Sequence, residues 1–492
     1  MPSNLTVIVL AAGGGTRMKS KTMKVLHEVG GRSMIGHVIA AVQATGPQRV
    51  VAVVGHQREQ VGPHIRDLAP DSLLAVQEEQ KGTGHAVRTA VETLVATDGP
   101  TEGTVVVAYG DTPLLEGDSL RAFVAEHEAA ERAVSILSGE LANPFGYGRV
   151  VRDEDGDVVA IVEEKDATAD QREIREINSG ILAFDAGFLL DALPRIGNDN
   201  AKGEYYLTDT VQIARDAGLT VGAWAIDDVM QTEGANDRVQ LAELGREMNR
   251  RIVTRWMRAG VTVMDPATTW IDADVVLAPD VTILPGTQLL GLTEVGEDAV
   301  VGPDTTLKDC EVGAGARVVR THGELAVIGA EATVGPFSYL RPGTRLGARG
   351  KIGGFVETKN AVIGEGAKVP HLSYVGDAEI GEGANIGAGT IFANYDGIAK
   401  HHTKIGRHAK TASNNTFVAP VEVGDGAATG AGSVIRRDVP PGALAVSSGP
   451  QRNLVGWSMR RRPGTDQAEA ARAALAESAA ADDQQADRPH DH

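Results

Sequence analysis

A glycine-rich loop directly follows the first apolar run of this chain, and its neighbours suggest phosphate chemistry. Residues 10–18 read Leu-Ala-Ala-Gly-Gly-Gly-Thr-Arg-Met. Glycines after a strand let backbone N–H groups approach phosphates closely. Met18 stands where a dinucleotide loop has its third glycine and where a Walker A loop has the glycine before lysine, so the loop is of neither kind. Arg17 and Lys24 add two fixed positive charges, as a bound triphosphate requires.

The loop belongs to a region in which aliphatic runs alternate with helical stretches. The continuous apolar runs at residues 7–10, 50–54 and 105–108 indicate strands buried on both faces of a parallel sheet. Residues 34–44 and 83–96, which lie between them, are predicted to be helices. This alternation is typical of a doubly wound, Rossmann-like α/β domain, in which ligands bind beyond the carboxyl ends of the strands.

The second half of the chain repeats with a period of six residues. An aliphatic residue followed by glycine recurs, for example at residues 328–329, 334–335, 352–353 and 380–381. This period fits a parallel β-helix, in which the aliphatic residue points inward and a corner glycine adopts positive φ. A disordered glycine-rich stretch is the alternative, but it would lack such regularly placed apolar residues.

Composition and periodicity divide the chain into four parts. Residues 1–237 are predicted to form the α/β domain. Residues 238–259 are predicted to form a linker helix, because their apolar residues recur at steps of three and four. Residues 260–463 are predicted to form the β-helix. Residues 464–492 are rich in Ala, Gln and Asp without a sustained apolar pattern, which predicts a disordered tail.

Bulk properties exclude several classes of protein. The formal net charge of −19 argues against general affinity for nucleic acid or anionic membranes. Cys310 is the single cysteine, so no disulfide forms within the chain, which is compatible with a reducing compartment. The sequence shows neither a signal peptide nor an apolar run long enough to cross a bilayer. We therefore expect a soluble cytoplasmic protein without membrane insertion.

The glycine loop resembles the signature of nucleotide-diphospho-sugar pyrophosphorylases. Followed by a hexapeptide β-helix, it resembles the family of bacterial bifunctional enzymes that join an N-acetylglucosamine-1-phosphate uridyltransferase to a glucosamine-1-phosphate acetyltransferase. The resemblance covers about residues 5–460, and several independent motifs agree. It implies a left-handed β-helix, a homotrimer with active sites between subunits, and a role in making UDP-N-acetylglucosamine for peptidoglycan and related cell-wall precursors.

For the first half, the resemblance implies a site for UTP and UDP-N-acetylglucosamine. Arg17 and Lys24 would stabilise charge on the transferred group, and Asp111 and Asn236 would hold Mg²⁺, which needs few protein oxygens. Taken alone, Asp111 is more simply a turn or helix-capping residue, so its role depends on the joint order of the motifs. The implied binding residues are Leu10, Ala11, Ala12, Gly13, Lys24, Gln77, Gly82, Thr83, Tyr109, Gly110, Asp111, Gly148, Glu163, Asn178 and Asn236.

For the second half, the resemblance implies an acetyl-transfer site, and charged residues gather there that a structural rod does not need. His371 would take the proton as the amine attacks the acetyl-CoA thioester. Lys400 would help to neutralise the sugar phosphate, and Asn394 with the backbone of Tyr395 would orient the amine and stabilise the oxyanion. Glucosamine-1-phosphate would contact Arg341, Lys359, Tyr374 and Asn385, whereas acetyl-CoA would contact Ala388, Asn394, Tyr395, Ser413, Ala431 and Ser448. The run 460–462 of three arginines is either a clamp for CoA phosphates or a solvated charge run.

The chain departs from the family pattern at three positions. Met23 replaces a proline before Lys24, Lys81 replaces an apolar residue, and Ala412 replaces a glycine before Ser413. Lys81 either adds a phosphate contact or points outward, and the methyl group of Ala412 could crowd the pantetheine arm.

Two other functions are compatible with parts of the sequence. A related ADP- or dTDP-sugar nucleotidyltransferase would also have an α/β domain and a β-helix, but it gives no reason for His371, Asn394 and Tyr395. A catalytically silent nucleotide-binding scaffold would explain the three departures, but not the retention of Lys24 and Asp111.

Overall fold

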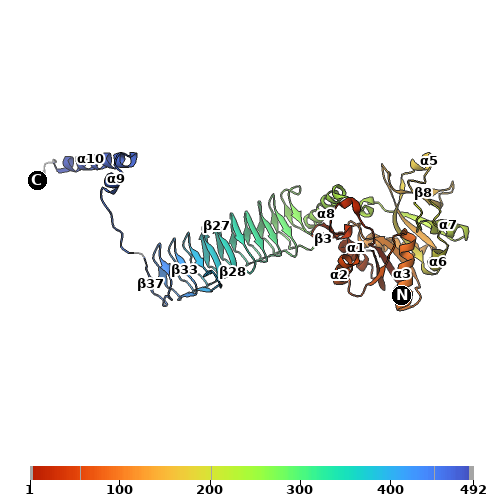
Figure 1. Cartoon of the computed structure of the whole chain (residues 1–492), viewed down its shortest axis with the longest axis horizontal. Helices are drawn as coiled ribbons and strands as arrows, with labels where there is room; N and C mark the ends of the chain where they lie inside the picture. Colours follow the sequence, from red (N-terminus) through yellow and green to blue (C-terminus); the bar gives the residue numbers. More distant parts are fainter. Residues whose placement is uncertain (1–3, 56, 201, 448, 487–492) are drawn as a thin grey trace.

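The chain forms an α/β domain, a long β-helix and a terminal pair of helices in series. The computed structural model describes residues 4–55, 57–200, 202–447 and 449–486. Figure 1 shows the α/β domain at one end of an elongated molecule, with the β-helix extending away from it toward the C-terminus. Within the described residues, no helix combines the length and the apolar run that a membrane crossing needs.

The α/β domain is built on a twisted sheet with strand order β11-β7-β10-β6-β1-β4-β5, and β8 and β9 extend from β10. The strands are β1 (Leu5–Leu10), β4 (Arg49–Val54), β5 (Leu73–Val76), β6 (Thr104–Tyr109), β7 (Val134–Glu140), β8 (Gly148–Arg152), β9 (Val158–Val162), β10 (Glu176–Asp185) and β11 (Val221–Ala225). The helices are α1 (Met34–Ala44), α2 (Arg58–Leu68), α3 (Thr83–Asp98), α4 (Gly117–Ala129), α5 (Ala169–Arg172), α6 (Ala186–Ala192) and α7 (Asp209–Asp216).

The sheet is mixed rather than wholly parallel. β1 pairs in parallel with β4 and β6, as the buried apolar runs predict, and every residue of β1 is buried. β10, however, runs antiparallel to both β6 and β7. The direction of a strand buried on both faces is not encoded in its apolar pattern, so the sequence did not reveal this reversal.

Helix α8 (Arg238–Arg258) connects the α/β domain to the β-helix. Asp237 caps its first turn by accepting hydrogen bonds from two backbone amides. Its buried face includes Leu244, Met248 and Ile252, which share a hydrophobic core with the first coils of the β-helix. The side chain of Asn249 also donates to Thr269 O at 2.8 Å, so both apolar and polar contacts fix the helix to the coils.

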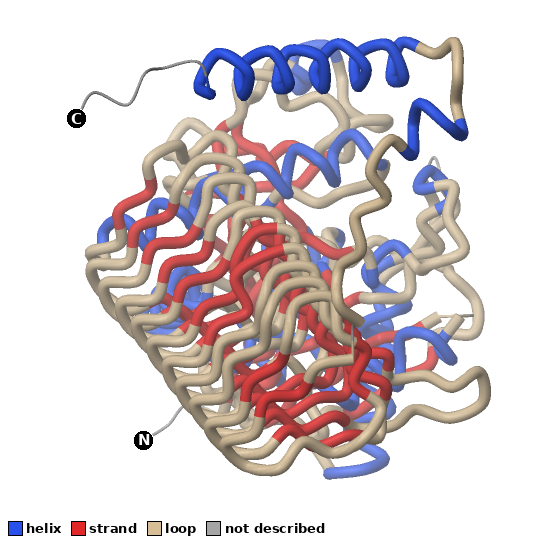
Figure 2. Tube along the Cα trace, turned by 90° about the vertical axis from the view of Figure 1, so that its left-hand side faces the viewer, coloured by secondary structure: helices blue, strands red, loops and turns tan. Residues whose placement is uncertain are grey.

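The β-helix is a stack of short parallel strands from β12 (Thr262–Val263) to β37 (Leu444–Ala445). Figure 2 shows its coils stacked along one axis. The strands that carry the candidate site are β25 (Ser338–Leu340), β27 (Lys351–Gly354), β28 (Glu357–Ile363), β29 (Lys368–His371), β30 (Tyr374–Ile380), β31 (Ile391–Ala393), β32 (Thr403–Ile405) and β33 (Thr416–Val418). The predicted fold class is confirmed, because these parallel coils are consistent with a left-handed β-helix.

Inward-pointing aliphatic residues stack from coil to coil. Val334 lies opposite Ile352, and Ile352 lies opposite Val369; all three are fully buried. Each repeat therefore removes its apolar side chain from water only when the next coil covers it.

The repeat glycines serve a different purpose from the one predicted. Of the glycines singled out above, Gly335 has a positive φ of 99°, whereas Gly329, Gly353 and Gly381 do not. A Cβ on Gly329 would lie 2.6 Å from Ala348 N in the following coil. Most of these glycines are thus required by the close approach of neighbouring coils, whereas the left-handed positions are taken by other glycines, such as Gly343, and by residues such as Asn360.

The tail differs from its predicted disorder. After α9 (Trp457–Arg461), α10 spans Asp466–Ala486, and Figure 1 shows both helices standing away from the coils. The segment is rich in alanine, with glutamate and glutamine among the other residues, and these types have high intrinsic helix propensity. Local propensity therefore favours a helix even where no apolar stripe calls for packing.

Candidate active sites

A cavity of about 420 Å³ opens at the carboxyl ends of the central strands of the α/β domain. β1 and β6 end side by side, with Leu10 opposite Tyr109, and Gly110 N donates to Leu10 O at 2.9 Å. Most of the residues predicted to bind nucleotide line this cavity, namely Leu10, Ala11, Ala12, Gly13, Lys24, Gln77, Gly82, Thr83, Tyr109, Asp111 and Asn236. A ligand would therefore sit where doubly wound sheets usually bind one.

Lys24 joins the two predicted metal ligands. Its ammonium forms an ion pair with Asp111 and donates a hydrogen bond of 2.8 Å to Asn236 Oδ1, although Asn236 is 212 residues away in sequence. Gly15 makes this placement possible, because it has φ 55° and a Cβ there would lie 2.5 Å from Lys24 Cβ. The glycine loop thus positions the lysine as well as leaving room for phosphate.

The same oxygens suit a divalent cation. Asp111 and Asn236 already share one cationic group, so their oxygens converge on a single point. Among the described residues, no cluster of three His, Cys, Asp or Glu side chains is arranged to hold a metal. A cation between Asp111 and Asn236 would thus take its remaining ligands from phosphate and water, as Mg²⁺ commonly does.

Gln77 is fixed in the wall of the cavity. It is 4% exposed, and its Nε2 lies 3.2 Å from Gly82 O and 2.9 Å from His85 Nδ1. Gly82 has φ 105°, and a Cβ there would lie 2.6 Å from Tyr205 O. With its nitrogen engaged, Gln77 presents a carbonyl oxygen that can accept a hydrogen bond from a pyrimidine N–H.

A second cavity of about 140 Å³ adjoins the first and shares Thr83 and Tyr109 with it. Glu163 and Asn178, both predicted to cradle the sugar, line it. Gly148 belongs to the same cluster, because it pairs with Asn178 across β8 and β10. The predicted sugar residues, which come from three separate segments of sequence, therefore meet at one place.

The smaller cavity also contains residues that the motifs did not indicate. Lys202, Glu204, Tyr206 and Thr208 line it. The hydroxyl of Tyr206 is buried without a hydrogen-bond partner among the described residues, which is costly unless a ligand supplies one. The sequence signal that could have revealed them is the run of polar and aromatic residues at 200–208, just before α7.

Burial changes the acidity of two groups beside the sugar cavity. It raises the pKa of Glu163 above its usual range, and the nearby Lys202 only partly opposes the shift. Burial also raises the pKa of Tyr109, with Glu163 and Asp111 adding to the effect. In both groups burial disfavours the ionised form, which suits them to hydrogen bonding with the uncharged part of a sugar.

Arg17 is not part of either cavity lining as the chain stands. Its side chain is exposed, and it makes no ion pair or hydrogen bond to the rest of the described chain. It follows the glycine loop directly, so its guanidinium remains available to a phosphate at the mouth of the cavity.

A larger cavity of about 760 Å³ lies between α1 and α8, away from these residues. Five arginines line it, and carboxylates pair with three of them, Arg32, Arg250 and Arg251. Arg251, for example, pairs with Asp228 at 2.8 Å and with Glu116 at 3.3 Å. We therefore assign the chemistry to the two cavities at the carboxyl edge of the sheet, whose residues are chemically specific.

In the β-helix, the residues predicted to bind the sugar phosphate stack on one side of successive coils. Glu357 lies opposite Tyr374, and Lys359 lies opposite Gly376. Arg341, one coil earlier, donates a hydrogen bond of 2.8 Å to Glu357. The coil register therefore gathers basic side chains that are distant in sequence.

Two of these cations face each other. The pKa of Lys359 is lowered, chiefly because the Lys400 ammonium is its close neighbour, and Arg341 adds a smaller repulsion. Like charges held together in this way disfavour the empty site and favour a bound dianion. Lys400 belongs to the loop that interrupts the repeat after Asn394, and that loop folds back so that His401 N donates to Asn394 O at 2.7 Å.

Three of the residues predicted to contact acetyl-CoA follow an adjoining corner, namely Ala388, Ser413 and Ala431. Gly389 N donates to His371 O at 3.3 Å, and Asn414 N donates to Ala388 O at 2.7 Å. Gly432 N donates to Ser413 O at 2.9 Å, so this line of corners runs from His371 toward Ala431. Ser448 lies outside the described residues.

One predicted sugar residue lies elsewhere. Asn385 forms bridges with Lys368 and Lys410 on the side of the coil that carries β27 and β29, whereas Arg341 and Lys359 belong to the side of β25 and β28. His371 and Tyr395 are both exposed, the latter by 60%. A single chain therefore displays the parts of this site on different faces instead of enclosing them.

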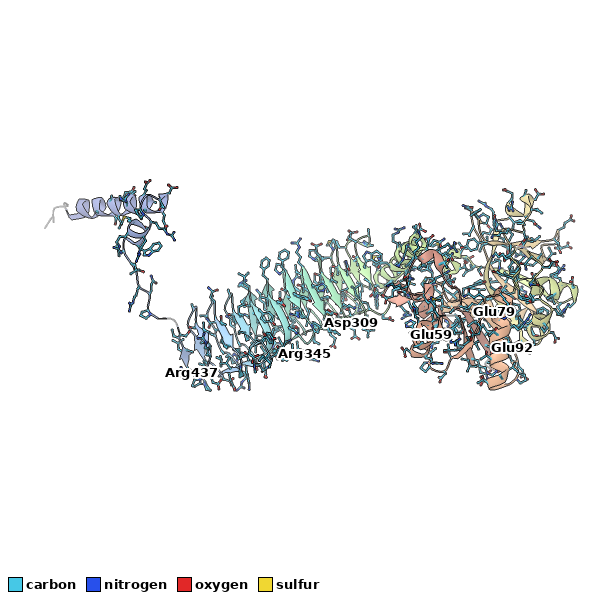
Figure 3. All side chains as sticks on the ribbon, viewed as in Figure 1. Glu59, Glu79, Glu92, Asp309, Arg345 and Arg437 are labelled. Atoms are coloured by element: carbon cyan, nitrogen blue, oxygen red, sulfur yellow. The ribbon has the colours of Figure 1, made fainter. Side chains whose placement is uncertain are left out.

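The three departures from the family pattern are accommodated locally. Met23 is buried, with φ −58°, and its N–H, which a proline would lack, donates to Gln60 Oε1 at 3.3 Å. Lys81 points outward and forms an ion pair with Glu79, which lies on the surface of the α/β domain (Figure 3). Ala412 N donates to Thr429 Oγ1 at 3.0 Å, and nothing in the structure explains the replacement of glycine there.

An α/β domain with this glycine loop and cavity, followed by a β-helix with a cationic face, defines a two-domain transferase of the nucleotidyltransferase type. Residues 7–168 match the family model of the MobA-like NTP transferase domain.

The chain is also similar over almost its whole length to curated relatives called bifunctional protein GlmU. The relative from Corynebacterium efficiens is 56% identical, with 96% of this chain and 97% of the relative covered. Those from Streptomyces avermitilis and Rhodococcus jostii are 57% and 58% identical, and cover 95% and 96% of this chain. The chain belongs to the GlmU family of bifunctional proteins, so the predicted family and enzyme class are confirmed.

Proposed function

We propose that the β-helix acetylates glucosamine-1-phosphate and that the α/β domain then couples the product to UTP. The overall product is UDP-N-acetylglucosamine, and CoA and pyrophosphate are released. The observation that carries the proposal is the shared placement of Lys24, Asp111 and Asn236 beside a cavity lined by the predicted nucleotide residues. The single cysteine and the substrate classes agree with a role in the cytoplasm.

In the first step, the sugar amine attacks the carbonyl carbon of the acetyl thioester. A C–N bond forms, the C–S bond breaks, His371 accepts a proton from the amine, and CoA leaves as its thiol after protonation. Arg341, Lys359 and Lys400 neutralise the sugar phosphate, and the facing lysines support this role. The exposed position of His371 allows both substrates to reach it.

In the second step, a phosphate oxygen of N-acetylglucosamine-1-phosphate attacks the α-phosphorus of UTP. The new P–O bond replaces the bond to the β-phosphate, and pyrophosphate leaves. Arg17 and Lys24 stabilise the charge on the transferred group. Asp111 and Asn236 would hold Mg²⁺, which would supply further neutralisation of the phosphate charge. Gln77 faces the uracil, while Glu163 and Asn178 hold the sugar.

We further propose that the active acetyltransferase is a homotrimer formed through the β-helix. Phe337, Phe355 and Leu372 occupy corners of neighbouring coils and are 53%, 62% and 61% exposed. The two phenylalanine rings stack at 5.3 Å with an interplanar angle of 17°. A continuous apolar stripe of this kind favours burial against another copy, and such packing would bring residues from different faces, such as Asn385, to one site.

The test measures both half-reactions on one purified sample of the full chain. Thiol release from acetyl-CoA in the presence of glucosamine-1-phosphate reports the first step, and pyrophosphate release from UTP with N-acetylglucosamine-1-phosphate reports the second. We expect both products. The absence of CoA release would remove the acetyltransferase assignment, and the absence of pyrophosphate would remove the uridyltransferase assignment.

A further inference from the structure

Asp377 occupies the corner at which the proposed sugar-phosphate residues meet. It belongs to β30, between Gly376, which lies opposite Lys359, and Ala378, which lies opposite Ala361. It has φ 46°, a left-handed conformation that Asp and Asn adopt more readily than most residues. None of the motifs that indicated the acetyl-transfer site includes this residue.

Each oxygen of its carboxylate accepts a hydrogen bond from a side-chain amide. Oδ1 accepts a hydrogen bond of 2.8 Å from Asn360 Nδ2, and Oδ2 accepts one from Asn394 Nδ2. Burial raises the pKa of Asp377, but the two amide donors together with the charges of Lys400 and Lys359 lower it by more, so the net shift is downward and the group is ionised. An ionised carboxylate only accepts hydrogen bonds, so it dictates which end of each amide faces it.

This contact fixes the orientation of Asn394. The side chain is 7% exposed, and its nitrogen points toward Asp377. Gly376 leaves the necessary space, because a Cβ there would lie 2.7 Å from Asn394 Nδ2. With the nitrogen held on one side, the carbonyl oxygen of Asn394 is turned to the other side, where it can accept a hydrogen bond from an amine.

We infer that Asp377 is a positioning residue for acetyl transfer, which holds the Asn394 amide so that its oxygen receives the amine of the glucosamine substrate. Without a fixed acceptor, the amide would flip freely and present its N–H groups to the amine for part of the time. The inference depends on the proposed function of the β-helix. Asp377 contributes no atom to the substrate and acts through Asn394.

The contribution of Asp377 differs from that of the phosphate-binding residues. Its negative charge lies near Lys359 and Lys400, and so opposes their attraction for a phosphate. Removing the charge should therefore not weaken binding of the sugar phosphate. A positioning role predicts a loss in kcat with an unchanged or lower KM for glucosamine-1-phosphate, whereas a general disruption of the site would raise KM.

The experiment makes the same Asp→Asn substitution at two positions of the β-helix in the full-length chain. Asp377→Asn removes the charge but keeps the shape. Asp309→Asn is the matched control, because Asp309 also has a positive φ, of 52°, in the β-helix and lies nearer the α/β domain than Arg345 does (Figure 3), outside the strands that carry the candidate site. CoA release, pyrophosphate release and thermal melting are measured for wild type, both single variants, Asn394→Ala and the Asp377→Asn/Asn394→Ala double variant.

We expect Asp377→Asn to lower kcat for CoA release by about 10- to 100-fold, the cost of a misplaced reacting group. KM for glucosamine-1-phosphate should stay within about twofold or fall, and pyrophosphate release should not change. Tm should fall by no more than about 5 °C, because the lowered pKa of Asp377 means that its ionised form contributes to folding stability. Asp309→Asn should behave as wild type. In the Asn394→Ala background, Asp377→Asn should cost less than about threefold, because the two residues act as one unit.

An unchanged kcat in Asp377→Asn, a raised KM with kcat retained, or an equal loss in the Asn394→Ala background would overturn the inference. These results are distinct from a failure of the proposed function, in which the wild-type chain itself would release no CoA.

Discussion

The two candidate sites are built in opposite ways. In the α/β domain, Lys24 reaches Asn236 across 212 residues of sequence, and the site lies inside a cavity of about 420 Å³. In the β-helix, Asn394 meets Asp377 across only 17 residues, and the site lies along exposed coil faces. A sheet with crossover helices gathers distant segments into a crevice, whereas a solenoid displays nearby ones in rows.

This difference has a consequence for assembly. The enclosed site has its walls, its cations and its oxygen ligands within one chain. The displayed site has its parts on more than one face, and His371 is exposed. The first site should therefore function in an isolated chain, and the second should depend on other copies of the chain.

The largest expected effect is in the displayed site. His371→Ala removes the proposed base, so CoA release should fall by about 10²- to 10⁴-fold. Pyrophosphate release should be unaffected, since no part of the α/β domain touches this corner. A parallel loss of pyrophosphate release would show that the two sites are coupled.

In the enclosed site, Asp111→Asn keeps the shape but removes the charge that faces Lys24. Pyrophosphate release should fall by about 10²- to 10³-fold, because a group that positions charge at the reacting phosphate is lost. CoA release from the same preparation is the control and should match that of the wild type. Full pyrophosphate release in this variant would contradict the assignment of Asp111.

Adding charge to the exposed apolar corners tests whether the β-helix site depends on contact with other copies of the chain. Phe337→Asp combined with Phe355→Asp places two carboxylates on the exposed apolar corners. The variant should sediment as a smaller species than wild type and lose CoA release by about tenfold or more, because like charges would meet in the interface. Pyrophosphate release should persist. A variant that sediments like the wild type and keeps full CoA release would exclude this surface from the interface.

In the site of the α/β domain, Glu163→Gln should have opposite effects on folding stability and on binding of the sugar substrate. Burial raises the pKa of Glu163 in the folded protein, so its protonated form is favoured and its ionised form weakens folding. The stability linked to this proton is present below the ordinary value of 4.5 and is lost as the pH rises through the raised pKa. Glu163→Gln should therefore raise Tm by about 1–3 °C at pH 8, with the gain vanishing toward pH 4.

The same variant should increase KM for N-acetylglucosamine-1-phosphate while leaving CoA release intact. The neighbouring change Glu164→Gln, at a partly buried position, serves as a control for stability, because the pKa of Glu164 is lowered by its hydrogen bond to Arg149. That change should not raise Tm at pH 8. A gain in both variants would contradict burial as the cause.

The smallest effect is expected at Lys81. Its ammonium pairs with Glu79 on the surface, and an exposed ion pair contributes little. Lys81→Ala should leave KM for UTP within about twofold in pyrophosphate assays. A larger increase would show that the side chain swings to a phosphate when nucleotide binds.

Much of this organisation could be predicted from the sequence because it depends on local periodicity. The aliphatic runs gave β1, β4 and β6, and the period of six gave the stacked core of Val334, Ile352 and Val369. The reversed direction of β10 and the helix α10 were missed, since apolar patterning specifies neither strand direction nor helices without a buried face.

The residues of the two sites could be predicted from the sequence only where they lie in recognisable motifs. Asp111 and Asn236 lie in recognisable segments, and the structure brings both to Lys24. Tyr206 and Asp377 lie outside such motifs, and they became visible only through a buried hydroxyl and a pair of amide contacts. Contacts between coils or across a cavity depend on three-dimensional packing, which residue spacing alone does not provide.

The most direct test of the account mixes two inactive proteins. His371→Ala and Asp111→Asn are each given glucosamine-1-phosphate, acetyl-CoA, UTP and Mg²⁺, alone and in an equimolar mixture, and UDP-N-acetylglucosamine is measured. We predict negligible product from either variant alone and restored product from the mixture, because the acetylated intermediate formed by one protein can reach the intact second site of the other. Full product from a single variant, or none from the mixture, would contradict the existence of two independent active sites in this chain.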